Sequence, residues 1–281
     1  MTPARPRLLV LGASSGIGAG CARVFARHGY DILGVHLDRR PAMPMVQQLI
    51  QELEACGAAV RFYNGNAADP EQRQQVVQSL RAELEPSAGR IDVLIHSLAF
   101  GSLGPFAPGA GSKPLRERQL SMTFEVMAAS LAWWVRDLVL ADLLGQTPTA
   151  SRPAPSASQA PEAGARVFAM TSAGTHRAWP DYGPVAAAKA ALDAIVRQLA
   201  LELAPRGVTV NSIMAGVTRT PALHAIPGHQ AMIDMAQARN PSGRLTLPED
   251  IGHCLLELAR PGTHWMTGNC IRVDGGEDSC A

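Results

Sequence analysis

The chain has 281 residues with 47% hydrophobic and 17% charged side chains, and its formal net charge is +1. This composition supplies a large core, and the near-neutral charge argues against nucleic acid as the main partner. No apolar run is long enough to span a bilayer, and residues 1–7 lead directly into a strand without room for a signal peptide. Five scattered cysteines without metal-ligand spacing predict reduced thiols in the cytoplasm and no metal site.

The first predicted elements are an apolar strand over residues 8–11, a glycine-rich turn and a helix that ends near Ala26. Glycines let the backbone approach a pyrophosphate, and a helix N-terminus offers free N–H groups and the positive end of its dipole. The turn is informative because a strand precedes it and a helix follows it. It predicts that a dinucleotide phosphate is bound by Gly12, Ser14, Ser15, Gly16, Ile17 and Gly18.

The second predicted strand, residues 30–37, ends next to one acidic and two basic residues. An acidic residue at this point usually binds the adenosine ribose hydroxyls, so Asp38 would suit NAD(H). Arg39 and Arg40 would instead hold the 2′-phosphate of NADP(H). The pattern favours NADP(H), with NAD(H) and an ordinary charged loop as the alternatives.

Strands and helices alternate along the rest of the chain, which predicts a parallel sheet covered on both faces. The expected fold is α/β: a single doubly wound Rossmann-type domain over residues 1–281 with a seven-stranded parallel sheet. Ligands of such sheets bind beyond the carboxyl ends of the strands. The further strands are expected at residues 58–63, 91–95, 167–170, 208–214 and 269–273, and further helices at 43–55, 70–84, 184–204 and 248–259.

Two features stand out between the fourth and fifth strands. Residues 115–143 are mostly apolar and predict one long helix, which lies in the core or at a subunit interface. Trp133 and Trp134 are adjacent, so one helix cannot point both rings inward. Residues 145–164 are of low complexity and predict a surface insertion that packs against nothing.

A stretch from Thr171 to Lys189 joins a buried strand to an alanine-rich helix. Pro184 suits the first helical position and disfavours helix in the preceding residue, so Gly183 is expected outside the helix and Tyr182 at its entrance. Lys189 comes two helical turns after Tyr182, on the same face and about 10 Å further along. A phenol near a cation is a proton donor with a lowered pKa. Taken alone, the pair is more typical of a surface tyrosine and a solvated lysine, and the other motifs of the chain favour the functional interpretation.

Residues 217–240 form an apolar segment with helical periodicity and proline or glycine joints. Such a segment fits a lid over an apolar substrate. The pattern alone fits a plain packed helix just as well.

Five motifs distributed along the sequence agree with one family. They are Gly12-x3-Gly16-x-Gly18, Asn66-Ala67, Asn211-x4-Gly216-x3-Thr220, Pro241-Ser-Gly-Arg244 with Pro248-Glu-Asp, and Val273-Asp-Gly-Gly276. With them the chain resembles the short-chain dehydrogenase/reductase family over essentially its whole length. Most members of that family have a tyrosine four residues before the lysine, where this chain has Val185. The wider Tyr182–Lys189 spacing resembles the bacterial enoyl-acyl-carrier-protein reductases.

Other segments agree with that branch. They are His96-Ser-Leu-Ala-Phe100, Arg177-Ala-Trp-Pro-Asp-Tyr182 and Ala215-Gly-Val-Thr-Arg-Thr220. Met127 stands where ordinary family members have a relay asparagine, a position that this branch also leaves without asparagine. Ser172 is a departure, because many enoyl reductases carry a second tyrosine there and ordinary ketoreductases keep a catalytic serine.

The resemblance implies NAD(P)H-dependent reduction of the 2,3-double bond of an enoyl thioester. Tyr182 would donate to the developing enolate, Lys189 would bind the nicotinamide ribose, and Ser172 would assist Tyr182. The remaining cofactor-binding residues that it implies are Asn66, Ala67, Ser97, Leu98, Ala99, Gly216, Thr218 and Thr220. The substrate side would be formed by Phe100, Val185, Ala222, Leu223 and Ile226.

The expected partner is an acyl thioester on acyl carrier protein or coenzyme A, without nucleic acid or membrane. The resemblance also implies a homotetramer or homodimer assembled through the helices at residues 115–143 and 184–204. Two alternatives stay open: a ketoreductase of the same fold, and a dinucleotide-sensing protein without catalysis. The Tyr182–Lys189 spacing argues against the first, and the presence of both residues argues against the second.

Overall fold

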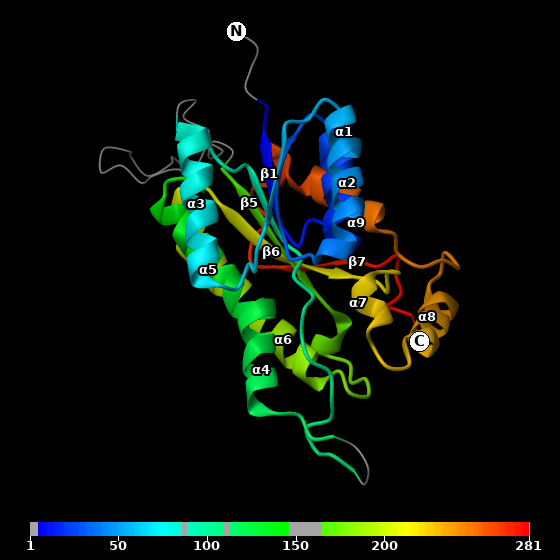
Figure 1. Ribbon diagram of the computed structural model, residues 1–281. Helices are drawn as coiled ribbons and strands as arrows, with labels where there is room; N and C mark the ends of the chain where they lie inside the picture. The colour runs from blue at the N-terminus through cyan, green and yellow to red at the C-terminus, as the bar shows by residue number, and fades with distance from the viewer. Residues whose placement is uncertain (1–4, 86–88, 110–112, 146–163, 281) are drawn as a thin grey trace.

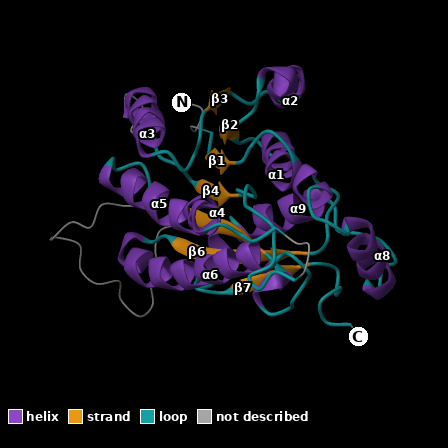
Figure 2. Cartoon of the chain, turned by 60° about the horizontal axis from the view of Figure 1, so that its bottom comes forward, coloured by secondary structure: helices purple, strands orange, loops and turns teal. Residues whose placement is uncertain are grey.

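One seven-stranded sheet forms the middle of the molecule, with helices on both of its faces (Figures 1 and 2). The computed structural model describes residues 5–85, 89–109, 113–145 and 164–280. Apart from its two end residues, the predicted insertion at 145–164 lies outside the described residues. The strand order is β3-β2-β1-β4-β5-β6-β7, and every neighbouring pair is parallel. The predicted α/β fold of Rossmann type is therefore confirmed.

The five inner strands are short and mostly buried, as expected for a parallel sheet covered on both faces, whereas the edge strands β3 and β7 are partly exposed. The strands are β1 (Arg7–Leu11), β2 (Asp31–His36), β3 (Val60–Asn64), β4 (Val93–His96), β5 (Arg166–Thr171), β6 (Thr209–Ala215) and β7 (Cys270–Val273). Successive side chains of a strand point to opposite faces. Leu8 and Val10 of β1 accordingly lie in one core cluster, whereas Leu9 and Leu11 lie in another.

The helices divide between these two clusters. Those described are α1 (Gly16–Arg27), α2 (Met43–Ala55), α3 (Pro70–Leu84), α4 (Glu117–Phe124), α5 (Ser130–Leu140), α6 (Gly183–Leu203), α7 (Pro221–His224), α8 (His229–Arg239) and α9 (Pro248–Leu258). Helices α1, α2 and α9 cover one face of the sheet, and α3, α5 and α6 cover the other (Figure 2). Among the described residues, no helix has both the length and the apolar composition that crossing a membrane requires.

The long helix predicted over residues 115–143 is present as a continuous helical run over residues 117–140, but its middle is not α-helical. A π-helical turn, η3 (Glu125–Ala129), separates α4 from α5. Directly after it, the Ser130 hydroxyl donates to the Val126 carbonyl at 2.7 Å, a side-chain bond of the kind that bends helices. Apolar periodicity does not reveal such a turn, because the residues on both sides of it stay buried.

Gly183 was expected outside the helix, yet α6 begins at this residue. The restriction on a residue before proline comes partly from a clash between the proline ring and the preceding Cβ atom. Glycine has no Cβ atom, which relieves that part of the clash. Tyr182 is the N-cap residue of α6, so its predicted place at the helix entrance is confirmed.

The tryptophan pair behaves as predicted, with the two rings on different sides of α5. Trp134 is fully buried, and its Nε1–H donates to the Ala67 carbonyl at 2.8 Å. Trp133 is 37% exposed; its Nε1–H donates to Glu125, and the Arg136 guanidinium lies 4.9 Å from its ring centroid. A subunit interface at this face stays a prediction.

Candidate active site

The glycine-rich turn after β1 is packed so closely that two of its positions have no room for a side chain. Gly12 has φ +89°, and a Cβ atom there would lie 2.5 Å from the Ser97 carbonyl oxygen. A Cβ atom on Gly18 would lie 2.1 Å from the Gly12 carbonyl oxygen. The turn is thus held between β1, β2 and β4, since the Gly12 N–H also donates to Val35 at 2.8 Å. Its open side is bare backbone, which is what a diphosphate needs for close approach.

The first turn of α1 provides donors for such an anion. Ser15 is the N-cap residue of α1, and within the described part of the chain its side chain makes no capping hydrogen bond. The first N–H groups of a helix have no partner within the helix, so those of Gly16, Ile17 and Gly18 remain for a ligand. Ser14 is half-buried and Ser15 is exposed beside them. These residues fit a dinucleotide phosphate.

The end of β2 presents a carboxylate that is held in place. The Asp38 carboxylate lies 2.8 Å from Nδ1 of the buried His36. The Asp38 backbone exchanges two hydrogen bonds with the Asn64 amide, at 3.1 and 3.0 Å. Arg39 and Arg40 are exposed, and in the described part of the chain neither forms an ion pair. The structure therefore offers both a ribose ligand and free cations at this point.

The ends of β3 and β4 contribute mainly backbone. The Asn66 amide oxygen accepts from the Ala68 N–H at 3.0 Å, while the Ala67 carbonyl is occupied by Trp134. After β4 the chain becomes exposed: Ser97 and Leu98 are half-buried, and Ala99 and Phe100 are exposed. Of the expected cofactor-binding residues here, Ala67 is buried, so only a small part of it is accessible to a bound cofactor.

The end of β5 brings together the two hydroxyls expected to act in catalysis. Ser172 Oγ lies 3.2 Å from Tyr182 OH and also accepts from the Gly174 N–H at 3.1 Å. The tyrosine ring lies directly over Gly174, where a Cβ atom would come within 2.5 Å of the ring. On the other side, the Phe106 ring lies against Gly183. Gly174 and Phe106 were not predicted from the sequence. The one available signal concerned Gly174, which lies two residues after Ser172.

The expected low pKa of Tyr182 is wrong for this structure. Burial raises the pKa of the phenol, and the hydrogen bond with Ser172 opposes this only partly. The Lys189 ammonium does not bond to the phenol; it donates to the carbonyls of Met170 at 2.7 Å and Leu98 at 3.3 Å. Tyr182 is therefore a protonated phenol at neutral pH, which is the form that donates a hydrogen bond.

Lys189 lies almost completely inside the protein, at 4% exposure. Burial lowers its pKa to about 8, and the Asp193 carboxylate opposes the shift. Two of the three ammonium N–H groups are used by the ends of β4 and β5, so the third is available for another acceptor. Burial and the Lys189 charge lower the pKa of the nearby His96 to about 3, so this imidazole stays neutral beside Lys189.

The turn after β6 is fixed from within and by the C-terminal segment. Thr218 Oγ1 donates to the Gly216 carbonyl at 2.9 Å, and Thr220 Oγ1 accepts from the Leu223 N–H at 3.2 Å as the N-cap of α7. The Val217 N–H donates to Glu277 at 2.9 Å. Gly216 and Thr218 are buried, whereas Thr220 is half-buried.

Residues 217–240, the expected lid, contain α7 and α8 and have a small core of their own. Leu223, Ile233, Ala236 and Leu245 are buried together, with Ile226 packed against them. Two of the expected substrate residues, Leu223 and Ile226, thus face this core. Such a unit fits both a packed helix pair and a lid that moves as one body.

The other expected substrate residues differ in exposure. Val185 is 6% exposed and packs with Met127 and Ala188, whereas Phe100 is 66% exposed and Ala222 is half-buried. Phe100 and Ala222 are therefore accessible to a ligand in this conformation. Contact of the buried residues with substrate stays a prediction.

Contacts between the loops show that these parts form one site. The glycine turn touches β4 through Gly12 and Ser97, and a Cβ atom on Gly16 would lie 3.1 Å from the Thr220 methyl group. Lys189 reaches the ends of both β4 and β5. The structure therefore brings the expected phosphate-binding and catalytic residues to the carboxyl edge of the sheet, although their roles stay predictions.

Comparisons with known proteins agree with this arrangement. The model of the family described as enoyl-(acyl carrier protein) reductase matches residues 12–141 and 142–277. The oxidoreductase UcpA of Salmonella typhimurium is 27% identical over 276 residues, which are 95% of this chain and 92% of that protein. The NADH-dependent enoyl-[acyl-carrier-protein] reductase FabI of Aquifex aeolicus is 25% identical over 273 residues, 96% of this chain and 90% of that one.

A solved structure shows the same fold. The 3-oxoacyl-[acyl-carrier protein] reductase of Brucella melitensis superposes with a TM-score of 0.76 at 23% identity, covering 100% of both chains. The fold is thus shared with proteins named for reducing different groups, and it does not by itself select the reaction. Because the family model covers nearly the whole sequence, the chain belongs to the short-chain dehydrogenase/reductase family, in the group described as enoyl-(acyl carrier protein) reductase, and is an NAD(P)H-dependent oxidoreductase.

Proposed function

We propose that this protein reduces the 2,3-double bond of an enoyl thioester. The observation that carries the proposal is the position of the phenol. Tyr182, seven residues before Lys189, contacts Ser172 at 3.2 Å, whereas the position four residues before Lys189 is a buried valine, Val185. Tyr182 is therefore the phenol that the described residues offer to a substrate at this end of β5.

The side chains can support such a reduction through charge stabilisation. Reduced nicotinamide dinucleotide supplies a hydride when it is bound. The protonated phenol of Tyr182 donates a hydrogen bond to the thioester oxygen as negative charge develops there. Ser172, whose Oγ already accepts from Gly174, can direct its own proton towards the phenol oxygen as Tyr182 donates. Lys189 contributes a nearby positive charge and its remaining N–H group for a ribose hydroxyl.

Apolar groups beside the phenol favour an acyl substrate. Phe106 lies against Gly183, next to Tyr182, and is 60% exposed; Phe100 is 66% exposed after β4. Exposed aromatic rings beside a site provide apolar area for a ligand. Acyl carrier protein and coenzyme A are both proposed as carriers, since the thioester end is common to them.

We also propose a homo-oligomeric assembly and a cytoplasmic location. The partly exposed Trp133 on α5 supports a homodimer or homotetramer through this helix and α6. All five cysteines are free, which is in keeping with a reducing, cytoplasmic environment.

The reaction is tested by following reduced dinucleotide absorbance with a crotonyl thioester and, in parallel, an acetoacetyl thioester. We expect oxidation of the dinucleotide with the crotonyl thioester and little with the acetoacetyl thioester, because the proposed geometry serves an enolate oxygen. Turnover of the acetoacetyl thioester alone would contradict enoyl reduction.

That second outcome corresponds to the other candidate function, reduction of a carbonyl. It is favoured by Ser172 itself, because the serine hydroxyl stands within hydrogen-bond distance of Tyr182 OH. A serine and a tyrosine together can bind one carbonyl oxygen from two sides. Both functions use the same dinucleotide site, so the substrate assay separates them.

We further propose that NADP(H) is preferred. The exposed Arg39 and Arg40 support this, because free guanidinium groups at the end of β2 can bind a 2′-phosphate. Replacing both by alanine is expected to weaken NADPH binding by about 1–3 kcal/mol and to leave NADH binding nearly unchanged. Dissociation constants from dinucleotide fluorescence give both values.

Arg81→Ala, an exposed arginine on α3, serves as the control for general loss of positive charge. An equal loss for NADPH and NADH would show that the pair is structural. In that case Asp38, held by His36 and Asn64, becomes the cofactor-selecting residue and favours NADH.

A further inference from the structure

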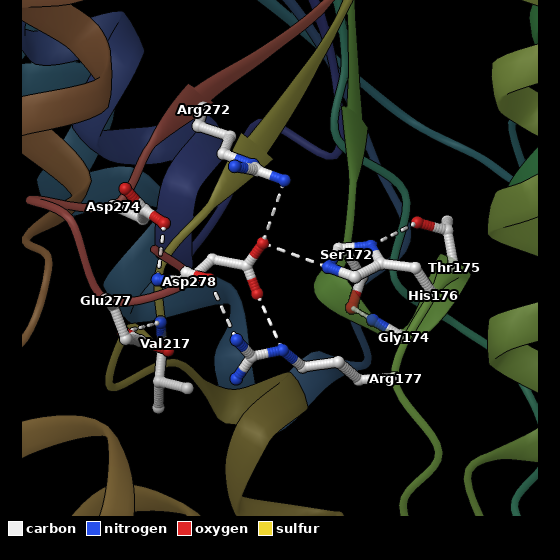
Figure 3. A network of polar contacts seen from close by, with 10 residues as sticks. All are labelled: Ser172, Gly174, Thr175, His176, Arg177, Val217, Arg272, Asp274, Glu277 and Asp278. Carbon is white, nitrogen blue, oxygen red and sulfur yellow. Dashed lines mark hydrogen bonds and ion pairs between the residues drawn. The ribbon is translucent and has the colours of Figure 1, made fainter. Parts of the chain in front are cut away.

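The segment that follows β7, residues 274–280, touches two loops of the candidate active site (Figure 3). One is the loop after β5, which carries Ser172 and leads to Tyr182. The other is the turn after β6, which begins at Gly216. Neither contact has a role in the reduction proposed for Tyr182, Ser172 and Lys189.

Asp278 makes the contact with the first loop. Its side chain is only 6% exposed and lies against two guanidinium groups and one imidazole, shown together in Figure 3. His176 Nε2 lies 2.9 Å from one carboxylate oxygen, Arg272 of β7 lies 3.2 Å from the same oxygen, and Arg177 Nε lies 2.8 Å from the other. Arg177 also donates to the Asp278 backbone carbonyl at 2.8 Å.

The segment around Asp278 is folded into a tight turn that aims the carboxylate. Asp274 accepts from the Gly276 N–H through one oxygen and from the Asp278 N–H through the other, both at 2.9 Å. Asp274 itself is buried. The backbone at Asp278 is therefore held by the turn that directly follows β7, in addition to its contacts with the loop.

Glu277 makes the contact with the second loop. One of its carboxylate oxygens accepts from the Val217 N–H at 2.9 Å and would lie 3.0 Å from a Cβ atom on Gly216. Burial raises the pKa of Glu277, and the neighbouring Asp274 adds to this. Two adjacent side chains thus hold the two loops, Glu277 at the turn after β6 and Asp278 at the loop after β5.

The contacts of Asp278 with the loop lie where they can affect the contact between Ser172 and Tyr182. His176 and Arg177 lie near the middle of the nine residues that separate Ser172 from Tyr182. A short hydroxyl contact between the two ends depends on the path of the chain between them. Because the middle of the loop is held in place, loop conformations that separate the hydroxyls of Ser172 and Tyr182 become less accessible.

We propose that Asp278 and Glu277 are positioning residues of the active site: Asp278 sets the Ser172–Tyr182 contact, and Glu277 sets the turn at Gly216–Thr220. The proposal rests on the proposed role of Tyr182 and Ser172. It assigns different consequences to the two carboxylates, because they hold different loops. Loss of Asp278 changes the rate of turnover, and loss of Glu277 changes dinucleotide binding.

The experiment compares Asp278→Asn and Glu277→Ala with wild type, in full-length protein. For Asp278→Asn we expect kcat to fall about tenfold or more and the dinucleotide Kd to stay within about twofold, since small displacements of reacting groups are costly. For Glu277→Ala we expect the Kd to rise several-fold. Asp278→Glu, which keeps the charge, is expected to recover part of kcat.

Asp137→Asn is the matched control. Asp137 is also a largely buried carboxylate with two guanidinium partners, Arg73 at 2.7 Å and Arg136 at 2.8 Å, but it joins α3 to α5. Asp137→Asn should lower the melting temperature, as should Asp278→Asn, because each substitution leaves guanidinium groups without their charged partner. Asp137→Asn should leave kcat unchanged. Equal kcat in Asp278→Asn and Asp137→Asn would overturn the proposal.

Hydrogen exchange provides a readout that needs no substrate. Amides of residues 172–182 should exchange faster in Asp278→Asn than in wild type and Asp137→Asn. If neither thioester is reduced, the proposed enoyl reduction is wrong. The hydrogen-exchange comparison would still show whether Asp278 positions the loop. Unchanged exchange in the loop would mean that Asp278 does not position it.

Discussion

Tyr182→Phe is expected to lower kcat by about 10²–10⁴-fold and to leave the dinucleotide Kd close to the wild-type value. The substitution removes one hydroxyl and keeps the ring, which lies over Gly174. The loop is therefore expected to keep its shape, while the developing oxyanion loses its donor. Steady-state kinetics and dinucleotide fluorescence measure the two quantities separately.

Tyr30→Phe is the control for this substitution. Tyr30 is also partly buried, and its ring packs against Phe25 with a centroid distance of 4.8 Å, at the opposite end of the sheet from Tyr182. It should leave kcat unchanged. Wild-type turnover in Tyr182→Phe would remove Tyr182 from the chemistry and with it the proposed mechanism.

Lys189→Met is expected to weaken dinucleotide binding by about 1.5–3 kcal/mol, the range for hydrogen bonds to charged groups, and also to lower kcat. Methionine retains much of the buried stem and removes the ammonium group. Both effects should appear together, because the same cation is proposed to bind the ribose and to support negative charge on the substrate. The chain has only one other lysine, the exposed Lys113, so Lys113→Met is a direct control.

The pH dependence of the wild type tests the same residue. Because burial lowers the pKa of Lys189 to about 8, the ammonium is present below this pH and is lost above it. The value of kcat/KM, which reports on the free enzyme, should therefore fall as the pH rises through about 8. In Lys189→Met this decline should be absent. A profile in the variant that still falls at this pH would assign the titration to another group.

Much of the fold follows from local sequence. The strand at residues 7–11, the glycine turn and the first helix are neighbours in the chain, and their apolar runs and glycines carry the information for their structure. The same is true of Tyr182 at the start of α6, because Pro184 fixes the helix N-terminus. A parallel sheet with helices on both faces was expected from the alternation of strands and helices, whereas the strand order was not predicted.

The remaining features depend on contacts that the local sequence does not contain. His176 and Asp278 are 102 residues apart, and nothing close to either residue indicates the other. The pKa of Tyr182 was predicted in the wrong direction because Lys189 turns to two backbone carbonyls, which no spacing argument reveals. The π-helical turn at η3, next to the Ser130–Val126 hydrogen bond, is likewise not indicated by the apolar pattern of this segment.

The strand order has a consequence for synthesis on the ribosome. The sheet extends from β1 first to β2 and β3 on one side, and then in chain order through β4, β5, β6 and β7 on the other. Since chains emerge from their N-terminus, the glycine turn can form while the later strands are still being made. The carboxylate of Asp278 emerges after all seven strands, so the loop between Ser172 and Tyr182 acquires its anchor only after β7 has been synthesised. A nascent chain of this protein would thus form the glycine turn first, while Glu277 and Asp278 complete the turn after β6 and the loop after β5 last.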